Sequence, residues 1–223
     1  MKLAKKLTLI FLAVGVIPPL AVGLFSLYQA SHQITEQTFN QLQAVRGVKK
    51  AQVESFFAER QADIEVLSKV VSVLYDRLGG ATEVQKTLSA PSSDGGENHG
   101  YFQEYIHAYD YYDLFLISPQ GDIFYTVAEE ADLNTNLVSG PYRDSGLGNL
   151  FKQVRESRGF AMEDFAPYSP SNDEPAAFIA QPIIKNNQLV MIVALQLSID
   201  KINGFMQIRE GMGKTGESYL IGP

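Results

Sequence analysis

The feature that most constrains this chain is an apolar run without charged residues at residues 7–28, LTLIFLAVGVIPPLAVGLFSLY. At a helical rise of about 1.5 Å per residue the run spans roughly 33 Å, enough to cross a hydrocarbon core of about 30 Å. Lys2, Lys5 and Lys6 precede the run, so the positive-inside rule places residues 1–6 in the cytoplasm. We therefore predict a single-pass anchor in the inner (cytoplasmic) membrane, with residues 29–223 on its periplasmic or extracellular side.

A cleaved signal peptide is the alternative interpretation of this run. The apolar region of a signal peptide usually has about 7–15 residues and is followed by small residues at the cleavage site. The run here is longer, and Tyr28, Gln29 and Ala30 match an A-x-A site poorly. We therefore interpret residues 7–28 as an uncleaved transmembrane helix.

Charge and cysteine content exclude several classes of function. The chain has 18 basic and 25 acidic residues, and removing the three N-terminal lysines leaves 15 against 25, or −10, for residues 29–223. Nucleic-acid binding needs a basic surface, so we expect no nucleic acid as a partner. The chain has no cysteine, which excludes disulfide scaffolds and thiol chemistry.

A long helix is predicted to continue directly from the membrane span. Residues 31–78 contain no proline and only one glycine, Gly47, and their apolar residues recur in steps of 3, 4 and 7. The residues of this seam, which Arg60 interrupts, are Val53, Phe57, Ile64, Leu67, Val71, Leu74 and Leu78. The seam fits a helix that covers its own domain, and the more polar residues 34–48 favour pairing with a second copy. We assign residues 29–80 to a stalk and homodimerisation helix that ends at Gly79 and Gly80.

The period of the apolar residues changes to that of strands after residue 110. Residues 81–100 have the composition of a loop, and a short helix is predicted at 101–109. The predicted strands are 113–118 and 123–127, which form a hairpin, and 160–168, 176–184 and 188–198, which form an antiparallel meander. Helices are predicted at 146–157, ending at Gly159, and at 199–209, followed by a new strand at 219–221. The predicted fold class is α+β, with the long helix covering one face of a five-stranded antiparallel sheet.

This order of elements resembles the extracytoplasmic double Cache sensor region of bacterial methyl-accepting chemotaxis receptors, sensor histidine kinases and diguanylate cyclases, whose modules are PAS-like. The stretches that carry the resemblance are YYDLFLISPQGDIFYTV (111–127), DLNTNLVSGPYRDSGLG (132–148), EDFAPYSPS (163–171), PAAFIAQPI (175–183) and GMGKTGESYLIGP (211–223). The resemblance implies that residues 81–198 are the membrane-distal ligand-binding module and that residues 199–223 lead into a membrane-proximal module. Family members continue with that module, a second membrane span and an output domain, so we expect this chain to be a fragment.

Motifs for nucleotides, metals and catalysis are weak. The GMGKTG segment at residues 211–216 matches a dinucleotide fingerprint by its letters, but a predicted helix precedes it and a predicted strand follows, the reverse of the required order. His32, His99 and His107 form no pair at a spacing of three or four residues, and no G-x-S-x-G motif occurs. We therefore expect a protein that is not an enzyme and that has no catalytic residues, metal or cofactor.

A set of aromatic and polar residues is the candidate ligand site. A small zwitterion needs an acceptor for its ammonium group, a donor for its carboxylate and an aromatic wall. In this interpretation Asp164 and Arg143 provide the two charges, and the resemblance implies contacts on the second hairpin strand, the crossover loop and the third strand. The predicted ligand-binding residues are Tyr125, Tyr142, Arg143, Asp144, Asp164, Tyr168 and Phe178. The alternative is that the aromatic residues are core and that Arg143 and Asp144 form a solvated pair.

The predicted function is small-molecule sensing, transmitted through movement of the long helix. The ligand is a small polar metabolite, that is, an amino acid, a carboxylate or an amine. The fuller Arg-aromatic motif of amino-acid-binding family members is not evident in residues 85–115, which leaves the other two classes equally open. The alternative function is that of an anchored module that acts only as an interaction or structural protein.

Overall fold

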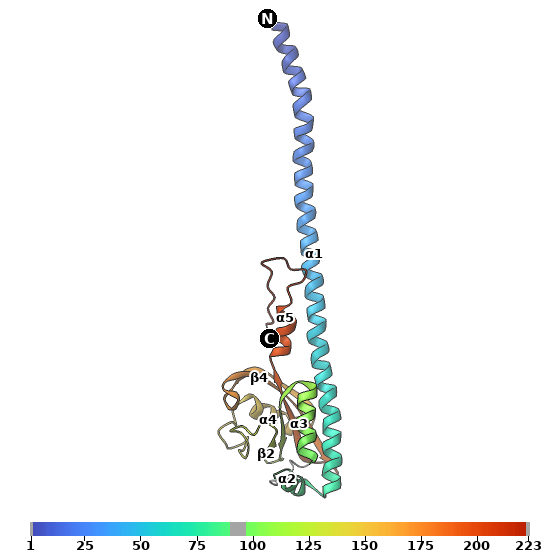
Figure 1. The fold of residues 1–223 in the computed structure, drawn as a ribbon. Helices are drawn as coiled ribbons and strands as arrows, with labels where there is room; N and C mark the ends of the chain where they lie inside the picture. Colours follow the sequence, from blue (N-terminus) through green and yellow to red (C-terminus); the bar gives the residue numbers. More distant parts are fainter. Residues whose placement is uncertain (1, 90–96, 222–223) are drawn as a thin grey trace. The chain divides into compact units, whose positions relative to one another are not determined.

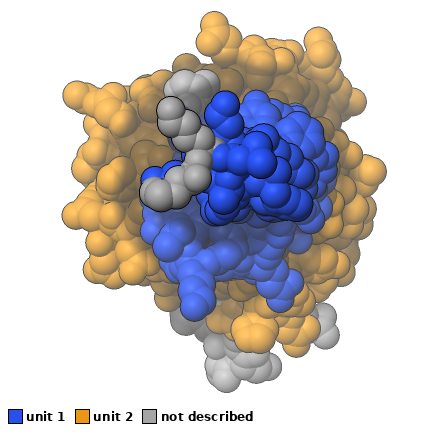
Figure 2. All heavy atoms as spheres, turned by 90° about the horizontal axis from the view of Figure 1, so that it is seen from above, with its two compact units in different colours: residues 1–52, 206–223 blue, residues 53–205 orange. Residues whose placement is uncertain are grey.

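The structure is a computed structural model that describes residues 2–89 and 97–221. It divides into two compact units, coloured in Figure 2: residues 1–52 with 206–223, and residues 53–205. Helix α1 (Lys2–Leu78) contributes to both units.

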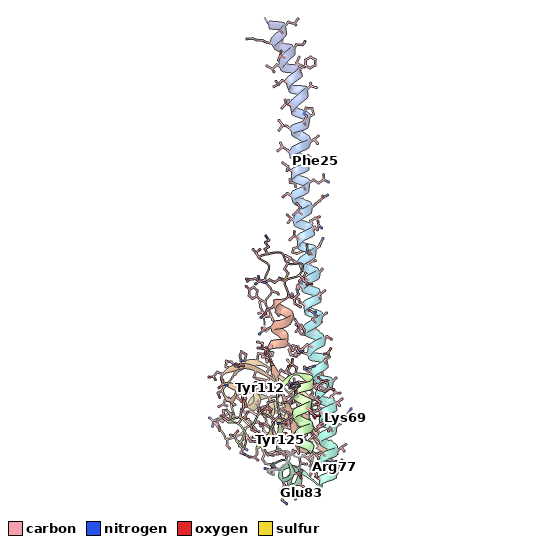
Figure 3. All side chains as sticks on the ribbon, in the orientation of Figure 1. Phe25, Lys69, Arg77, Glu83, Tyr112 and Tyr125 are labelled. Carbon is pink, nitrogen blue, oxygen red and sulfur yellow. The ribbon has the colours of Figure 1, made fainter. Side chains whose placement is uncertain are left out.

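The first unit contains the predicted membrane span. Residues 7–28 are helical throughout, including Pro18 and Pro19, and α1 is the one helix of the described residues that is long and apolar enough to cross a membrane. Its large apolar side chains project outward, as Phe25 does in Figure 3, where 66% of its surface is exposed. Such exposure of apolar side chains along a helix is what a lipid-facing segment requires.

The C-terminal segment of the first unit packs on α1 through hydrogen bonds to backbone carbonyls. Lys49 Nζ donates to Met206 O at 2.9 Å and to Ile208 O at 2.8 Å, at the end of helix α5 (Asp200–Gln207). Gln41 Nε2 donates to Gly211 O at 2.9 Å. The strand predicted at 219–221 is wrong, because no strand among the described residues pairs with this segment and its backbone is irregular.

The second unit is built on a five-stranded sheet. The strands are β1 (Tyr111–Ile117), β2 (Ile123–Thr126), β3 (Ala161–Tyr168), β4 (Glu174–Lys185) and β5 (Gln188–Ser198). All neighbours are antiparallel and their order is β2-β1-β5-β4-β3, which confirms the predicted hairpin and meander. The register shifts between Tyr111 and Asp113 in β1, and between Glu163 and Ala166 in the edge strand β3.

One face of the sheet is covered by the second part of α1 and by helix α3 (Glu97–Tyr109), as Figure 1 shows. Ile64, Leu67, Val71 and Leu74 of the predicted α1 seam are buried there, and α1 ends before Gly79 as predicted. The start of the seam differs from the prediction by one residue. Phe56 is buried, whereas the predicted Phe57 is half-exposed.

The loop predicted for residues 81–100 is wrong over most of its described length. Helix α2 (Ala81–Ser89) packs on β2, and α3 begins at Glu97, earlier than predicted, so that residue 99 is helical; residues 90–96 lie outside the described part of the chain. Val84, which is fully buried, and Leu88 are four residues apart and mark one face of α2. This four-residue spacing is helical, and it is the sequence feature from which α2 could have been predicted.

The other face of the sheet is covered by helix α4 (Gly146–Ser157) and the loop before it. Ser145 is the N-cap of α4, and its Oγ accepts a hydrogen bond from Gly148 N at 3.2 Å. The chain leaves the helix at Arg158, whose φ of 55° is left-handed, one residue before the predicted end at Gly159. The core of this face is made of Phe115, Ile117, Leu137, Leu147, Leu150, Phe151, Val154, Phe178, Ile192 and Ala194, among others.

Candidate functional site

Buried polar side chains interrupt the apolar core on the α4 face, near the start of β1 and the end of β5. We call this group the polar cluster; its members are Asp113, Asp132, Tyr168, Ser171 and Gln196, each at most 3% exposed. Asp113 and Gln196 are register partners on β1 and β5, and Phe178 on β4 is the other register partner of Gln196. Strand pairing therefore brings together polar residues that are far apart in the sequence.

Asp113 closes the end of the hairpin with one of its two oxygens. Its Oδ1 accepts hydrogen bonds from the backbone N–H groups of Leu114 at 2.7 Å, Val127 at 2.8 Å and Ala128 at 2.9 Å. Its Oδ2 is buried and has no hydrogen-bond partner. Burial raises the pKa of Asp113 to about 7, although the three backbone donors oppose that rise.

Asp132, in the loop after β2, is held by Tyr168 at the end of β3. The Tyr168 hydroxyl donates to Asp132 Oδ2 at 2.5 Å, and Asp132 Oδ1 is buried without a partner. Burial raises the pKa of Asp132, and the nearby charge of Glu130 adds to that rise. Burial and the charge of Asp132 raise the pKa of Tyr168, so the phenol keeps its proton and remains the donor.

A chain of hydrogen bonds fixes the orientation of the Gln196 amide. Tyr112 OH donates to Glu130 Oε1 at 2.7 Å, and Ser171 Oγ donates to Glu130 Oε2 at 2.8 Å. Ser171 has only one hydroxyl proton, so its oxygen accepts from Gln196 Nε2 at 3.0 Å. Gln196 Oε1 is therefore the free end of the amide, and it is buried without a partner.

Three of the predicted ligand-binding residues gather beside the polar cluster. The Tyr168 ring meets the Phe178 ring edge-on, with centroids 4.9 Å apart, and the half-buried Tyr142 ring at 6.3 Å. Of these three residues Tyr168 contacts Asp132, through its hydroxyl. The sequence-based prediction did not include the Asp132 carboxylate.

The other four predicted residues are placed differently, on the face covered by α3, on β3 or in the exposed loop before α4. Tyr125, labelled in Figure 3, is opposite Leu116 in the hairpin and its ring lies 5.6 Å from that of Phe102, on the α3 face of the sheet. Asp164 is exposed on β3 and accepts the N–H of Phe165. The last two, Arg143 and Asp144, form an exposed ion pair with an N–O distance of 3.0 Å. A role for any of the seven in ligand binding stays a prediction.

The sequence contains a signal for the residues that were missed. Asp113 stands inside the apolar strand YYDLFLI and Gln196 inside VMIVALQLS, both of which are buried. A polar residue in a strand buried on both faces must find a partner or bind something. Asp132 and Ser171 carry no comparable signal, because both lie in segments with the composition of loops.

The polar cluster presents hydrogen-bond acceptors and one phenol hydroxyl, that of Tyr168, which is already bound to Asp132. In the part of the chain that the structure describes, no three His, Cys, Asp or Glu side chains are grouped so as to hold a metal ion. Buried unpartnered acceptors are uncommon in folded proteins and are usually satisfied by water or by a ligand. The arrangement is therefore suited to binding a small molecule that brings hydrogen-bond donors.

Comparison with known proteins gives matches in structure only. No model of a protein family matches the chain, and no curated protein matches its sequence. The ligand-binding domain of the Campylobacter jejuni chemoreceptor Tlp3, in complex with 4-methylisoleucine, matches with a TM-score of 0.59 at 11% identity, over 77% of this chain and 62% of that one. The ligand-binding domain of the Pseudomonas aeruginosa PAO1 amino-acid chemoreceptor PctC, in complex with GABA, matches with a TM-score of 0.52 at 10% identity, over 76% and 65%.

The sensory domain of Tlp3 also matches, with a TM-score of 0.55 at 13% identity, over 81% of this chain and 66% of that one. The chain thus spans slightly less than two thirds of the solved domains that it matches. The fold is that of chemoreceptor sensory domains, which confirms at the level of the fold the resemblance seen in the sequence.

Proposed function

We propose that this chain is the extracytoplasmic sensing region of a bacterial membrane receptor and that it binds a small polar molecule at the polar cluster. The observation that carries the proposal is the set of three buried oxygens without donors, on Asp113, Asp132 and Gln196. A buried acceptor that lacks a donor costs about 1–3 kcal/mol, which a bound molecule recovers by supplying the donor. The fold, shared with chemoreceptor ligand-binding domains, supports the same use.

The anchor in this proposal is the apolar part of α1. Residues 7–28 cross the inner membrane, residues 1–6 remain in the cytoplasm, and residues 29–223 lie outside. The three lysines before the run support this orientation, and the exposure of its apolar side chains supports a lipid-facing span. The predicted domain boundaries, 29–80, 81–198 and 199–223, are part of the same proposal.

Strand β1 is the proposed route from the bound molecule to α1. Asp113 contributes to the polar cluster, and two residues earlier the Tyr111 hydroxyl donates to Asp63 Oδ2 of α1 at 2.9 Å. Asp63 also forms an ion pair with Arg60, with an N–O distance of 3.2 Å. A molecule that binds more tightly when β1 is in one position than in another shifts the protein toward that position, and α1 moves with β1. The size of the shift is set by the difference in affinity.

Homodimerisation through residues 34–48 completes the proposal. Four large apolar side chains on this part of α1 are exposed: Ile34, Phe39, Leu42 and Val48. A second copy of the same helix covers part of this apolar surface in a parallel pair, beside the side that the C-terminal segment occupies through Gln41 and Lys49. In the dimer the two α1 helices can move relative to each other, and a receptor can transmit that movement.

The test is a thermal-shift screen of the full chain in detergent micelles against amino acids, carboxylates and amines. We expect a saturable rise in Tm with one class, because a molecule that binds only the folded state stabilises it. Tyr168→Phe removes the hydrogen bond that holds Asp132, and we expect it to reduce the rise. Glu156→Gln, an exposed acid on α4, is the matched control. A folded protein without a saturable shift for any class would favour the interaction or structural function instead.

A further inference from the structure

Acceptors exceed donors at the polar cluster, which constrains what can bind there. The three oxygens without a donor are Asp113 Oδ2, Asp132 Oδ1 and Gln196 Oε1. The hydroxyl donors are already engaged, because Tyr168 donates to Asp132 and Ser171 donates to Glu130. While the two carboxyls are ionised and can only accept, a molecule that enters the cluster has to bring N–H or O–H donors of its own.

The negative charge of the site is also unbalanced. Asp113 and Asp132 are fully buried, and the half-buried Glu130 lies close enough to Asp132 to raise its pKa. Among the residues that the structure describes, no Lys or Arg forms an ion pair with any of these three carboxyls. A cation placed among them would replace repulsion by attraction and would favour their ionised forms.

Gln196 points to a ligand independently of the carboxyls. Its side chain is neutral, and the residue is 3% exposed on the central strand β5. Its hydrogen bond to Ser171 sets which end of the amide is the donor, so its unpartnered Oε1 follows from the network rather than from an arbitrary choice of orientation. This neutral acceptor and the two carboxyl oxygens have the same need for a donor.

We infer that the polar cluster binds an organic cation that carries ammonium N–H groups and no carboxylate. The inference rests on the proposed function and specifies the class of ligand. An ammonium group has three N–H donors, which matches the three unpartnered oxygens. Tyr168, whose hydroxyl contacts Asp132, packs against the rings of Tyr142 and Phe178, and aromatic rings attract cations.

An amino acid fits this site less well than a simple amine. The carboxylate of an amino acid needs a donor, and the two hydroxyl donors of the polar cluster, on Tyr168 and Ser171, are engaged. Arg143, which the sequence-based prediction assigned to this task, is exposed and ion-paired with Asp144. The Tlp3 and PctC domains were solved with 4-methylisoleucine and GABA, which both carry a carboxylate, so this chain is inferred to differ from them in ligand class.

A matched set of four-carbon compounds tests the inference: butylammonium, 1,4-diaminobutane, 4-aminobutanoate and butanoate. Each is titrated calorimetrically into the full chain in detergent micelles. We expect the two amines to bind, 4-aminobutanoate to bind at least about 10-fold more weakly than butylammonium, and butanoate not to bind. Tighter binding of 4-aminobutanoate or butanoate would overturn the cation inference but leave the sensing function in place. Binding of none of the four would overturn the inference, and failure of the broader Tm screen as well would overturn both.

Two variants locate the bound cation. Asp113→Asn and Asp132→Asn each keep an oxygen for the existing hydrogen bonds and remove the charge. We expect each to weaken butylammonium binding about 10- to 100-fold, the range of one charge-assisted hydrogen bond, while Glu156→Gln leaves it unchanged. Equal affinities in all three variants would place the cation elsewhere and overturn the inference.

Proton release gives a second measurement that needs no variant. Asp113 has a pKa of about 7, so part of the free protein carries a proton there at neutral pH. A bound cation lowers that pKa and expels the proton, which titrations in two buffers of different ionisation enthalpy detect. We expect net proton release on binding of butylammonium near pH 7; binding without release would contradict contact with Asp113.

Discussion

The two faces of the sheet each bury a group of polar side chains, and the two groups differ in charge balance. On the face covered by α1 and α3, Arg60 forms an ion pair with Asp63 and donates to Tyr109 O at 2.8 Å. Its guanidinium lies 4.9 Å from the centre of the Tyr111 ring. On the α4 face, the acids of the polar cluster have no cationic partner among the described residues. A balanced group stabilises the fold by itself, whereas an unbalanced group is stable only at a cost that a ligand can remove.

The largest expected effect is on the balanced face. Arg60→Ala leaves Asp63, whose side chain is 18% exposed, with the Tyr111 hydroxyl but without its cationic partner, and removes the ring contacts of the guanidinium. We expect the free energy of unfolding to fall by about 3 kcal/mol, because breaking a buried pair strands the remaining charge. Urea unfolding measures the loss, and Arg143→Ala, at an exposed pair, is the control. Equal losses in the two variants would show that the pair at Asp63 is no more than a surface contact.

The next effect concerns pH and the unbalanced face. The folded pKa of Asp113, about 7, lies above its ordinary value of 3.8, so the folded state binds more protons than the unfolded state between these values. Stability should therefore fall as the pH rises from about 4 to about 7, by at most about 4 kcal/mol from this residue. Asp113→Asn should flatten the decline.

Urea unfolding at pH 5 and pH 8 checks this expectation, with Glu156→Gln as the control that keeps the decline of the parent protein. If the parent protein were more stable at pH 8 than at pH 5, the charge of Asp113 would be better satisfied than the structure indicates.

A smaller effect is expected for Tyr168→Phe, which removes the side-chain donor to the buried Asp132 carboxyl. We expect a loss of about 1–3 kcal/mol at neutral pH, the usual cost of leaving a buried polar group unsatisfied. The loss should shrink at acidic pH, where Asp132 carries a proton. Tyr142→Phe, at the neighbouring half-buried ring, is the control, and thermal unfolding at two pH values is the measurement.

The smallest effect is expected for an ion pair at the rim of the balanced face. Lys185 on β4 lies 2.6 Å from Asp76 Oδ2 of α1, but the two side chains are 28% and 61% exposed. We expect Lys185→Ala to cost about 0.5 kcal/mol, because solvent screens such pairs. A loss as large as that of Arg60→Ala would mean that pairing matters more than burial on this face.

Local patterns predicted most of the second unit. The hairpin, the meander, α4 and the buried α1 residues Ile64, Leu67, Val71 and Leu74 follow from apolar period and turn residues, which act over short distances along the chain. The strand order was less accessible, since β5 lies between β1 and β4 through pairing of segments about 80 residues apart. Helix α2 was missed because it has only about two turns and two apolar anchors.

The candidate site was predicted less completely because it depends on which face of the sheet a side chain occupies. Tyr125 and Thr126 are adjacent in β2, and only the register with β1 assigns Tyr125 to the α3 face. Asp132 and Tyr168 are 36 residues apart and meet only when the loop after β2 folds over β3. The aromatic residues Tyr142, Tyr168 and Phe178 of the predicted site are neighbours in the fold, whereas Asp132, which contacts Tyr168, was not among the predicted residues.

The two outer strands of the sheet limit how copies of this chain can associate. Edge strand β3 carries a register shift, Pro167, which has no N–H to donate, and the exposed Asp164, while the opposite edge strand, β2, has only four residues. Bulges, prolines, charges and short strands at an edge all discourage a further strand from adding to the sheet. Neither edge is therefore suited to continuing the sheet into a second molecule, and self-association by strand exchange or fibre growth is disfavoured. The helical surfaces, rather than the sheet edges, are therefore the ones suited to the proposed pairing of two copies.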